Sequence, residues 1–202
     1  MAGRCSALFV IAAALAAAAL AEPQVPAETG TAAPHSGAAT VVYLVRHAEK
    51  ASSGTGTEGP GPPLSEEGKL RAEQLANTLR AEGITHIYST GFARTMETAG
   101  PLAGRLGVKI ETYDPKDLKG FARKLAALPG RHLVVGHSNT TPELVELLGG
   151  DAGPPIDEQR EYDRLYVLVL SPGGKVTTLH LRYGPPFSPS RDGPGGPSGG
   201  GL

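Results

Sequence analysis

The chain is poor in cysteine and tryptophan and has no excess of either charge. Its 202 residues include one cysteine, Cys5, and no tryptophan. A single cysteine excludes an intramolecular disulfide framework, so the fold must depend on an ordinary hydrophobic core. Lys and Arg together number 19, and Asp and Glu number 20. This balance lacks the basic stripe typical of nucleic-acid-binding proteins, so we expect no nucleic-acid partner.

A long apolar run is also lacking. The apolar stretch over residues 8–21 is shorter than the about 20 residues that a membrane-spanning helix needs. It follows the basic residue Arg4 and ends on Ala19-Leu20-Ala21. This pattern is typical of a cleaved export signal, so we predict a signal peptide over 1–21 and a periplasmic or extracellular protein. An uncleaved anchor is the alternative. Beyond this segment we expect no contact with a membrane.

Two further segments lack periodicity. Residues 22–39 are rich in Pro, Ala, Thr and Gly, and residues 185–202 are rich in Gly, Pro and Ser. Such compositions predict a disordered spacer and a disordered tail. Between them, residues 40–184 are enough for a single domain with an ample core.

Within this domain, strand patterns alternate with helical ones, which predicts an α/β fold. We expect N-caps at Ser65, Asp117 and Thr141. The last two strands flank Ser171-Pro172-Gly173-Gly174, a hairpin turn. The prediction is therefore a three-layer, mostly parallel sheet flanked by helices, with a C-terminal antiparallel hairpin at one edge. The expected strands are 41–46, 84–89, 132–136, 164–170 and 175–181, and the expected helices are 65–81, 92–106, 117–128 and 141–148.

Cations and imidazoles follow three of these strands. Arg46 and His47 end the first strand, His137 follows a later one, and Arg94 lies in a strand-to-helix turn or the first helical turn. Ligands of α/β folds bind at the carboxyl ends of the strands. One guanidinium group can donate two parallel hydrogen bonds to two phosphate oxygens. The two arginines and two histidines therefore predict a site for a phosphoryl group. The histidines lack metal-ligand spacing, and we expect no metal.

The chain resembles the histidine phosphatase superfamily, the phosphoglycerate mutase-like group. The resemblance implies that His47 is the nucleophile, attacking phosphorus to form a phosphohistidine that water then hydrolyses. Arg46, Arg94 and His137 would bind the phosphate oxygens, with Ser138 as a further donor and His137 either protonated or hydrogen bonding. No cofactor is implied, and the partner would be a small phosphorylated substrate or a phosphoprotein. The matching segments, in order, are Arg46-His47-Ala48, Leu64-Ser65-Glu66-Glu67-Gly68, Tyr88-Ser89-Thr90 through Arg94 to Thr98-Ala99, and Val135-Gly136-His137-Ser138.

The sequence contains no recognisable motif for the general acid. Many members of the superfamily carry a Glu downstream of the second Arg, or an Asp directly after the second His, where this chain has Ser138. Asp114 is the candidate acid, with Glu111 and Asp117 as neighbouring carboxylates. Glu49 is more simply interpreted as the partner of an Arg or Lys, or as a carboxylate at a helix start. If no acid exists, substrates with good leaving groups are favoured, such as phosphoramidates, phosphohistidine or acidic phosphoesters.

Three classes of function remain after these observations. A phosphohydrolase acting through His47 is favoured. A phosphoglycerate mutase fits less well, because the segments between the motifs are short and an export signal suits glycolysis poorly. A non-catalytic phosphate-binding module is the third. Specificity would lie in 51–63, which could form a wall or lid, and in 107–117 and 151–162.

Overall fold

The computed structural model describes residues 39–54 and 59–185. The predicted signal peptide lies outside these residues, as do the predicted spacer and tail except for Ala39 and Pro185. Within this part, no helix is both long and apolar enough to cross a membrane. The elements in chain order are β1 (Thr40–Arg46), α1 (Glu66–Leu79), β2 (His86–Ser89), α2 (Ala93–Leu106), β3 (Ile110–Thr112), α3 (Leu118–Ala127), β4 (Arg131–Gly136), α4 (Thr140–Leu147), β5 (Arg164–Leu170) and β6 (Val176–Arg182).

The strands form one sheet in the order β3-β2-β4-β1-β5-β6. β3, β2, β4 and β1 are parallel, whereas β5 runs antiparallel to β1 and to β6. The mostly parallel α/β sheet and its C-terminal hairpin at one edge are thus confirmed. In the register of β1 and β4, Arg46 pairs with Gly136. This register brings the residues that follow the two strands, His47 and His137, to the same edge of the sheet.

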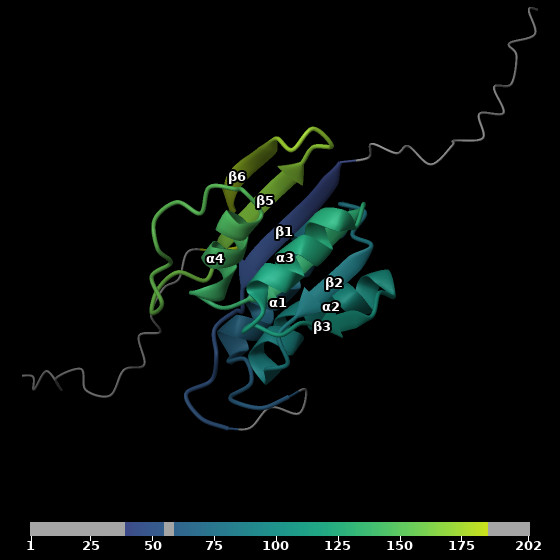
Figure 1. Ribbon diagram of the computed structural model, residues 1–202. Coiled ribbons are helices and arrows are strands. Elements are labelled where there is room, and N and C mark those ends of the chain that lie inside the picture. The colour runs from purple at the N-terminus through teal and green to yellow at the C-terminus, as the bar shows by residue number, and fades with distance from the viewer. Residues whose placement is uncertain (1–38, 55–58, 186–202) are drawn as a thin grey trace, which may run out of the picture. The chain divides into compact units, whose positions relative to one another are not determined.

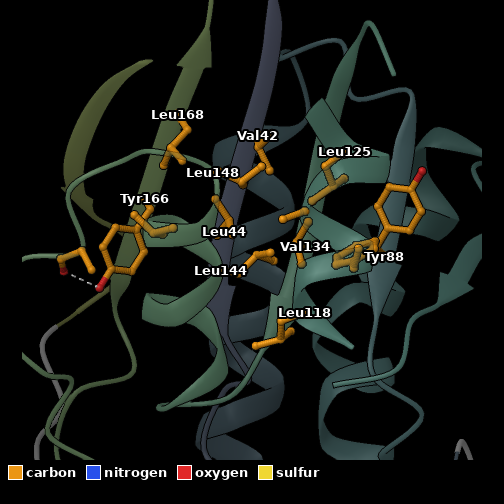
Figure 2. Close-up of a cluster of buried hydrophobic side chains, with 14 of the residues drawn as sticks. Val42, Leu44, Tyr88, Leu118, Leu125, Val134, Leu144, Leu148, Tyr166 and Leu168 are labelled. Carbon is orange, nitrogen blue, oxygen red and sulfur yellow. Dashed lines mark hydrogen bonds between the residues drawn. The ribbon is translucent and has the colours of Figure 1, made fainter. Parts of the chain in front are cut away.

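Helices cover both faces of the sheet, as Figure 1 shows, with α3 and α4 on the nearer face and α1 and α2 on the other. Successive residues of β1 alternate between the two cores because strand side chains point to opposite faces. Val42 and Leu44 pack with α3 and α4, as Figure 2 shows, whereas Tyr43 and Val45 pack with α1 and α2. Burial on both faces explains why β1 reads as an unbroken apolar run.

Local patterns explain where two of the four described helices begin. The Ser65 side chain accepts a hydrogen bond from Gly68 N (3.1 Å), and Asp117 accepts one from Gly120 N (2.9 Å), so both predicted N-caps are confirmed. The prediction for Thr141 is wrong. Helix α4 begins one residue earlier, and the Thr141 hydroxyl instead donates to the Val45 carbonyl (3.3 Å) across the sheet edge.

The strand β3 is an addition to the prediction, which left residues 107–117 as a loop. Its three residues pair with β2, with Ile110 opposite Ile87. A strand of this length carries no readable alternation, so only its pairing partner defines it. It places the 113–117 turn at the same edge of the sheet as His137, since the Tyr113 hydroxyl lies 3.4 Å from the Val135 carbonyl.

Candidate active site

Four of the predicted site residues meet at the carboxyl edge of the sheet. Arg46 ends β1, His47 follows it, His137 follows β4, and Arg94 lies in the first turn of α2. The rings of His47 and His137 are edge to face, with centroids 5.5 Å apart. The Arg94 guanidinium lies 3.5 Å from His137 Nδ1. Arg46 and His47 are both buried. Residues separated by up to 91 positions in sequence therefore form one compact cluster.

The backbone selects the tautomer of His47. Its Nδ1 lies 2.7 Å from the Ala48 carbonyl oxygen. A carbonyl oxygen only accepts, so Nδ1 must carry the proton. Nε2 is then the nitrogen with the lone pair. The same Ala48 is held by its N–H, which donates to the Thr98 hydroxyl (3.0 Å). His47 is thus oriented with one ring nitrogen prepared to act as a nucleophile.

Burial keeps both site histidines neutral. Desolvation is the largest cause that lowers the pKa of His47 to about 3. The Ala48 hydrogen bond, second in size, opposes it, and the charges of Arg46 and Arg94 lower the pKa further. Desolvation, then Arg94 and Arg46, lowers the pKa of His137 to about 4. An unperturbed imidazole has a pKa near 6.5. In this structure His47 is instead unprotonated well below neutral pH, and His137 fits the hydrogen-bonding role and not the protonated one.

The lowered pKa of His47 makes stability depend on pH. Between pH 6.5 and about 3, His47 is protonated in the unfolded chain but not in the folded chain. The free energy of unfolding should therefore be highest above pH 6.5 and fall by about 1.4 kcal/mol per pH unit below it from this residue alone. Urea unfolding at pH 7.5, 5.5 and 4.5 should show a steeper loss in the wild type than in His47→Gln. Equal slopes in the two proteins would contradict the prediction.

His137 is held by a short chain of hydroxyl groups. Its Nδ1 faces Arg94, which only donates, so Nε2 carries the proton and donates to the Thr90 hydroxyl (3.0 Å). Thr90 in turn contacts the Thr95 hydroxyl (2.8 Å). The His137 N–H donates to the Thr140 hydroxyl (3.1 Å). The side chain and the backbone of His137 are thus fixed from both sides.

The two arginines bring positive charge and unpaired donors to the site. The Nε atoms of Arg46 and Arg94 are buried and have no hydrogen-bond partner within residues 39–54 and 59–185. Burial lowers the pKa of both guanidinium groups, and in Arg94 the nearby charge of Arg46 lowers it further. Aromatic rings support the planar groups: Tyr162 lies 4.1 Å from Arg46 and Phe92 lies 4.7 Å from Arg94. Two cations with unused N–H donors suit a tetrahedral anion.

The predicted carboxylates have partners other than the two site histidines. Asp114 is exposed, and its side chain accepts from the Lys116 N–H (2.9 Å) in its own turn. Glu49 forms a buried ion pair with Arg71 (2.7 Å), as expected of a partner for Arg or Lys. In the part of the chain that the structure describes, no carboxylate is hydrogen bonded or ion paired to His47 or His137. The geometry thus provides a nucleophile and an anion site, while the acid role of Asp114 stays a prediction.

The structure also places Ser138 and part of the 51–63 segment. Ser138 is half-buried in the turn before α4, next to His137. Residues 59–61 of the predicted wall lie beside the start of α2, where Ala93 N donates to the Pro60 carbonyl (3.1 Å). Within residues 39–54 and 59–185, no three His, Cys, Asp or Glu side chains are arranged to hold a metal ion.

Sequence reasoning missed residues that orient the site. The Thr98 hydroxyl joins two motifs, accepting from Ala48 N and donating to the Arg94 carbonyl (2.6 Å). Its place in the matching Arg94-to-Ala99 segment was a usable signal. Tyr162 had no signal, because its contact with Arg46 spans more than 110 residues of chain.

The comparisons with known proteins agree with this geometry. Residues 42–115 match the model of the histidine phosphatase superfamily (branch 1). This match covers 74 of the 202 residues and makes the chain similar to that superfamily. The match contains Arg46, His47 and Arg94, whereas His137 lies outside it.

Curated proteins match a short part of the chain. The "probable phosphoglycerate mutase GpmB" of Yersinia enterocolitica is 36% identical over 77 residues, which are 37% of this chain and 35% of the relative. The chain therefore spans about a third of the length of the curated relatives that it matches.

Solved structures share the fold over a longer stretch. The protein histidine phosphatase SixA, complexed with tungstate, superposes with a TM-score of 0.58 at 19% identity, covering 70% of this chain and 96% of that one. A mycobacterial glucosyl-3-phosphoglycerate phosphatase gives a TM-score of 0.53 at 13% identity, covering 72% and 98%. These similarities show that the chain shares the fold of these phosphatases.

Proposed function

We propose that this chain is an exported phosphohydrolase that acts through a phosphohistidine on His47. The observation that carries the proposal is the state of His47: its Nδ1 proton is held by the Ala48 carbonyl (2.7 Å), and its pKa is lowered to about 3. A neutral ring with a defined Nε2 lone pair, next to Arg46, Arg94 and His137, is the arrangement that nucleophilic attack on phosphorus requires.

The reaction takes two steps in this site. Nε2 of His47 bonds to phosphorus as the bond to the leaving group breaks, and the leaving group departs with the electron pair. Water then attacks the phosphorus, the N–P bond breaks, and orthophosphate and neutral His47 are restored. The Nε–H groups of Arg46 and Arg94 donate to the non-bridging oxygens and offset their charge in both transition states. A bound dianion would raise the pKa of His137 and strengthen its contact.

The site favours substrates whose leaving group needs no protonation by the enzyme. Asp114 is exposed and accepts a hydrogen bond within its own turn, and no other described carboxylate is bonded to the site histidines. A phosphoramidate, such as phosphohistidine in a protein or a small molecule, or an acidic phosphoester, meets this condition. The fold shared with a protein histidine phosphatase is consistent with such a substrate.

The alternatives have less support. The short match to the GpmB relatives argues against a mutase, whereas the phosphatases of similar fold are covered almost completely by this chain. A binding module without turnover would need the same anion site. It would leave the prepared Nε2 of His47 without a role.

A panel of substrates tests the proposal. We expect phosphate release from p-nitrophenyl phosphate and phosphoimidazole, with kcat/KM about 100-fold or more above that for glycerol phosphate, because a general acid is worth at least this much with poor leaving groups. Asp114→Asn should leave this ratio unchanged. A selective loss of glycerol phosphate turnover in Asp114→Asn would instead identify it as the acid. Exchange of phosphate without release would indicate a mutase, and binding without either reaction would indicate a binding module.

Export forms a separate part of the proposal. It is supported by the pattern of residues 1–21, which lie outside the described residues. The N-terminal sequence of the mature protein, recovered outside the cytoplasm, should start at Glu22. Recovery of the full-length chain in the cytoplasm would contradict it.

A further inference from the structure

The guanidinium of Arg46 is held by a turn that lies 111 or more residues later in the chain. Its NH1 donates to the carbonyls of Asp157 (3.2 Å) and Glu161 (3.1 Å), and its NH2 donates to that of Glu158 (2.6 Å). Tyr162 stacks against the same group at 4.1 Å. Both terminal nitrogens are therefore engaged with the protein. Of its three nitrogens, only the buried Nε has no hydrogen-bond partner among the described residues. The 157–162 segment thus sets the direction in which Arg46 can donate to a phosphate.

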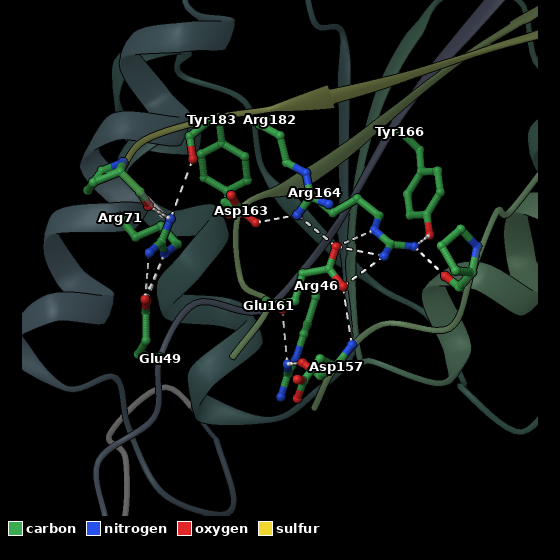
Figure 3. A network of polar contacts seen from close by, with 12 residues as sticks. Arg46, Glu49, Arg71, Asp157, Glu161, Asp163, Arg164, Tyr166, Arg182 and Tyr183 are labelled. Atoms are coloured by element: carbon green, nitrogen blue, oxygen red, sulfur yellow. Dashed lines mark hydrogen bonds and ion pairs between the residues drawn. The ribbon is translucent and has the colours of Figure 1, made fainter. Parts of the chain in front are cut away.

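This segment has no regular secondary structure, so side chains must hold its shape. The carboxylate of Glu161 does so by accepting from the Asp157 N–H (3.1 Å), while the Glu161 N–H donates to the Asp157 carbonyl (2.9 Å). The carbonyls of the two residues that close the turn in this way are the ones that bind NH1 of Arg46. Figure 3 shows Glu161 between Arg46 and the arginines of the sheet.

The same carboxylate ties the turn to the sheet. Arg164, at the start of β5, donates to it through Nε (2.6 Å) and NH2 (2.7 Å), the two-pronged geometry that gives the strongest pairing. Arg164 is buried and also donates to the Pro154 carbonyl (2.6 Å) and the Tyr166 hydroxyl (2.9 Å). Arg182 of β6 adds a further ion pair at 2.7 Å. The turn is thus fixed to two strands through one side chain.

We propose that Glu161 is a positioning residue that sets the orientation of Arg46 in the phosphate site. The inference rests on the proposed function only in assigning Arg46 to the phosphoryl group. Without the Glu161 carboxylate, the Asp157–Glu161 turn keeps only its backbone closing bond and loses its charged connection to Arg164. The carbonyls that hold Arg46 are then free to move, and the Nε–H is no longer kept in a direction to donate to the anion.

The test is Glu161→Gln in the full chain, read as affinity for orthophosphate by titration calorimetry. Glutamine has almost the same shape and can still accept from the Asp157 N–H, but it cannot pair with Arg164 as a charged fork. Asp163→Asn is the matched control, because it also removes one negative charge and loses an ion pair with Arg182 (2.6 Å) without touching the turn. We expect about tenfold weaker phosphate binding in Glu161→Gln and less than a twofold change in Asp163→Asn. An equal loss in both variants would overturn the proposal.

A double-mutant cycle separates positioning from general structural support. If Glu161 acts through Arg46, Glu161→Gln should weaken phosphate binding in the wild type but not in an Arg46→Ala background. The same loss in both backgrounds would overturn the proposal. Should Glu161→Gln fail to fold, Arg164→Lys, which keeps the charge but loses the fork, should show the same dependence on Arg46. Because the readout is binding, a protein without turnover would refute the proposed function and leave this test intact.

Discussion

Replacing His47 by alanine should lower phosphate release from p-nitrophenyl phosphate by at least about 10³-fold. The reason is the loss of the only nitrogen lone pair that the site prepares: Nδ1 of His47 is committed to the Ala48 carbonyl, and His137 is hydrogen bonded to Thr90 and faces Arg94. Added imidazole should partly restore turnover by entering the space that the ring leaves. A rapid quench of the wild type with labelled substrate should trap a phosphate label that is stable in alkali and lost in acid.

His180→Ala provides the control for this experiment. His180 is exposed on β6, which β5 separates from β1, and it packs edge to face on Tyr166. Its removal should leave turnover within twofold of the wild type. Phosphate binding should survive in His47→Ala, because Arg46, Arg94 and His137 remain. Unchanged turnover in His47→Ala would exclude the phosphohistidine route, and retained phosphate binding in the same protein would show that its site is still folded.

Replacing Gly68 by alanine should destabilise the protein by about 2–3 kcal/mol, although alanine is usually the better helix former. A Cβ at this position would lie 2.0 Å from the Glu49 carbonyl oxygen. This backbone cannot move cheaply, because the same oxygen accepts from Ser65 N (2.9 Å) and the Glu49 side chain is buried against Arg71. Glu49 is two residues from His47, so we also expect kcat to fall by about tenfold through displacement of Ala48.

Gly104→Ala is the matched control for this helix substitution. Gly104 lies in α2 with nothing within 4 Å of the added Cβ. The substitution should therefore stabilise the protein by about 0.4–1 kcal/mol, since it lowers the entropy of the unfolded chain without strain. Urea unfolding of both variants gives the comparison. A stabilised Gly68→Ala protein would show that α1 does not require this close approach to the end of β1.

Most elements of the fold could be predicted because their signals are local. The buried strand β1, the capping side chains Ser65 and Asp117, and the hairpin at 171–174 each depend on neighbouring residues only. Two details could not be predicted in this way. β3 is too short to show a period, and the hydroxyl of Thr141 bonds to Val45 of another element instead of capping its own helix.

The sequence predicted which residues form the site, but not the lowered pKa of its two histidines. Sequence order placed Arg46, His47, Arg94 and His137 after strands or at a helix start, and parallel strands bring such positions to one edge. Nothing in that order indicated how deeply the imidazoles are buried. Desolvation is the largest cause of the low pKa of His47 and of His137, and it depends on all the elements that cover them.

By itself, the sequence determined the α/β fold, the nucleophile candidate and the class of anion, because strand periodicity and the residue types at strand ends are read within a few positions. Only the tertiary structure decided the tautomer and charge of His47, the exposed position of Asp114, and the capture of Arg46 by the 157–161 turn. These features depend on burial and on contacts between distant segments, the Arg46–Glu161 hydrogen bond spanning 115 residues. Contacts between residues so far apart leave no local sequence pattern, because neither residue is unusual among its own neighbours in the chain.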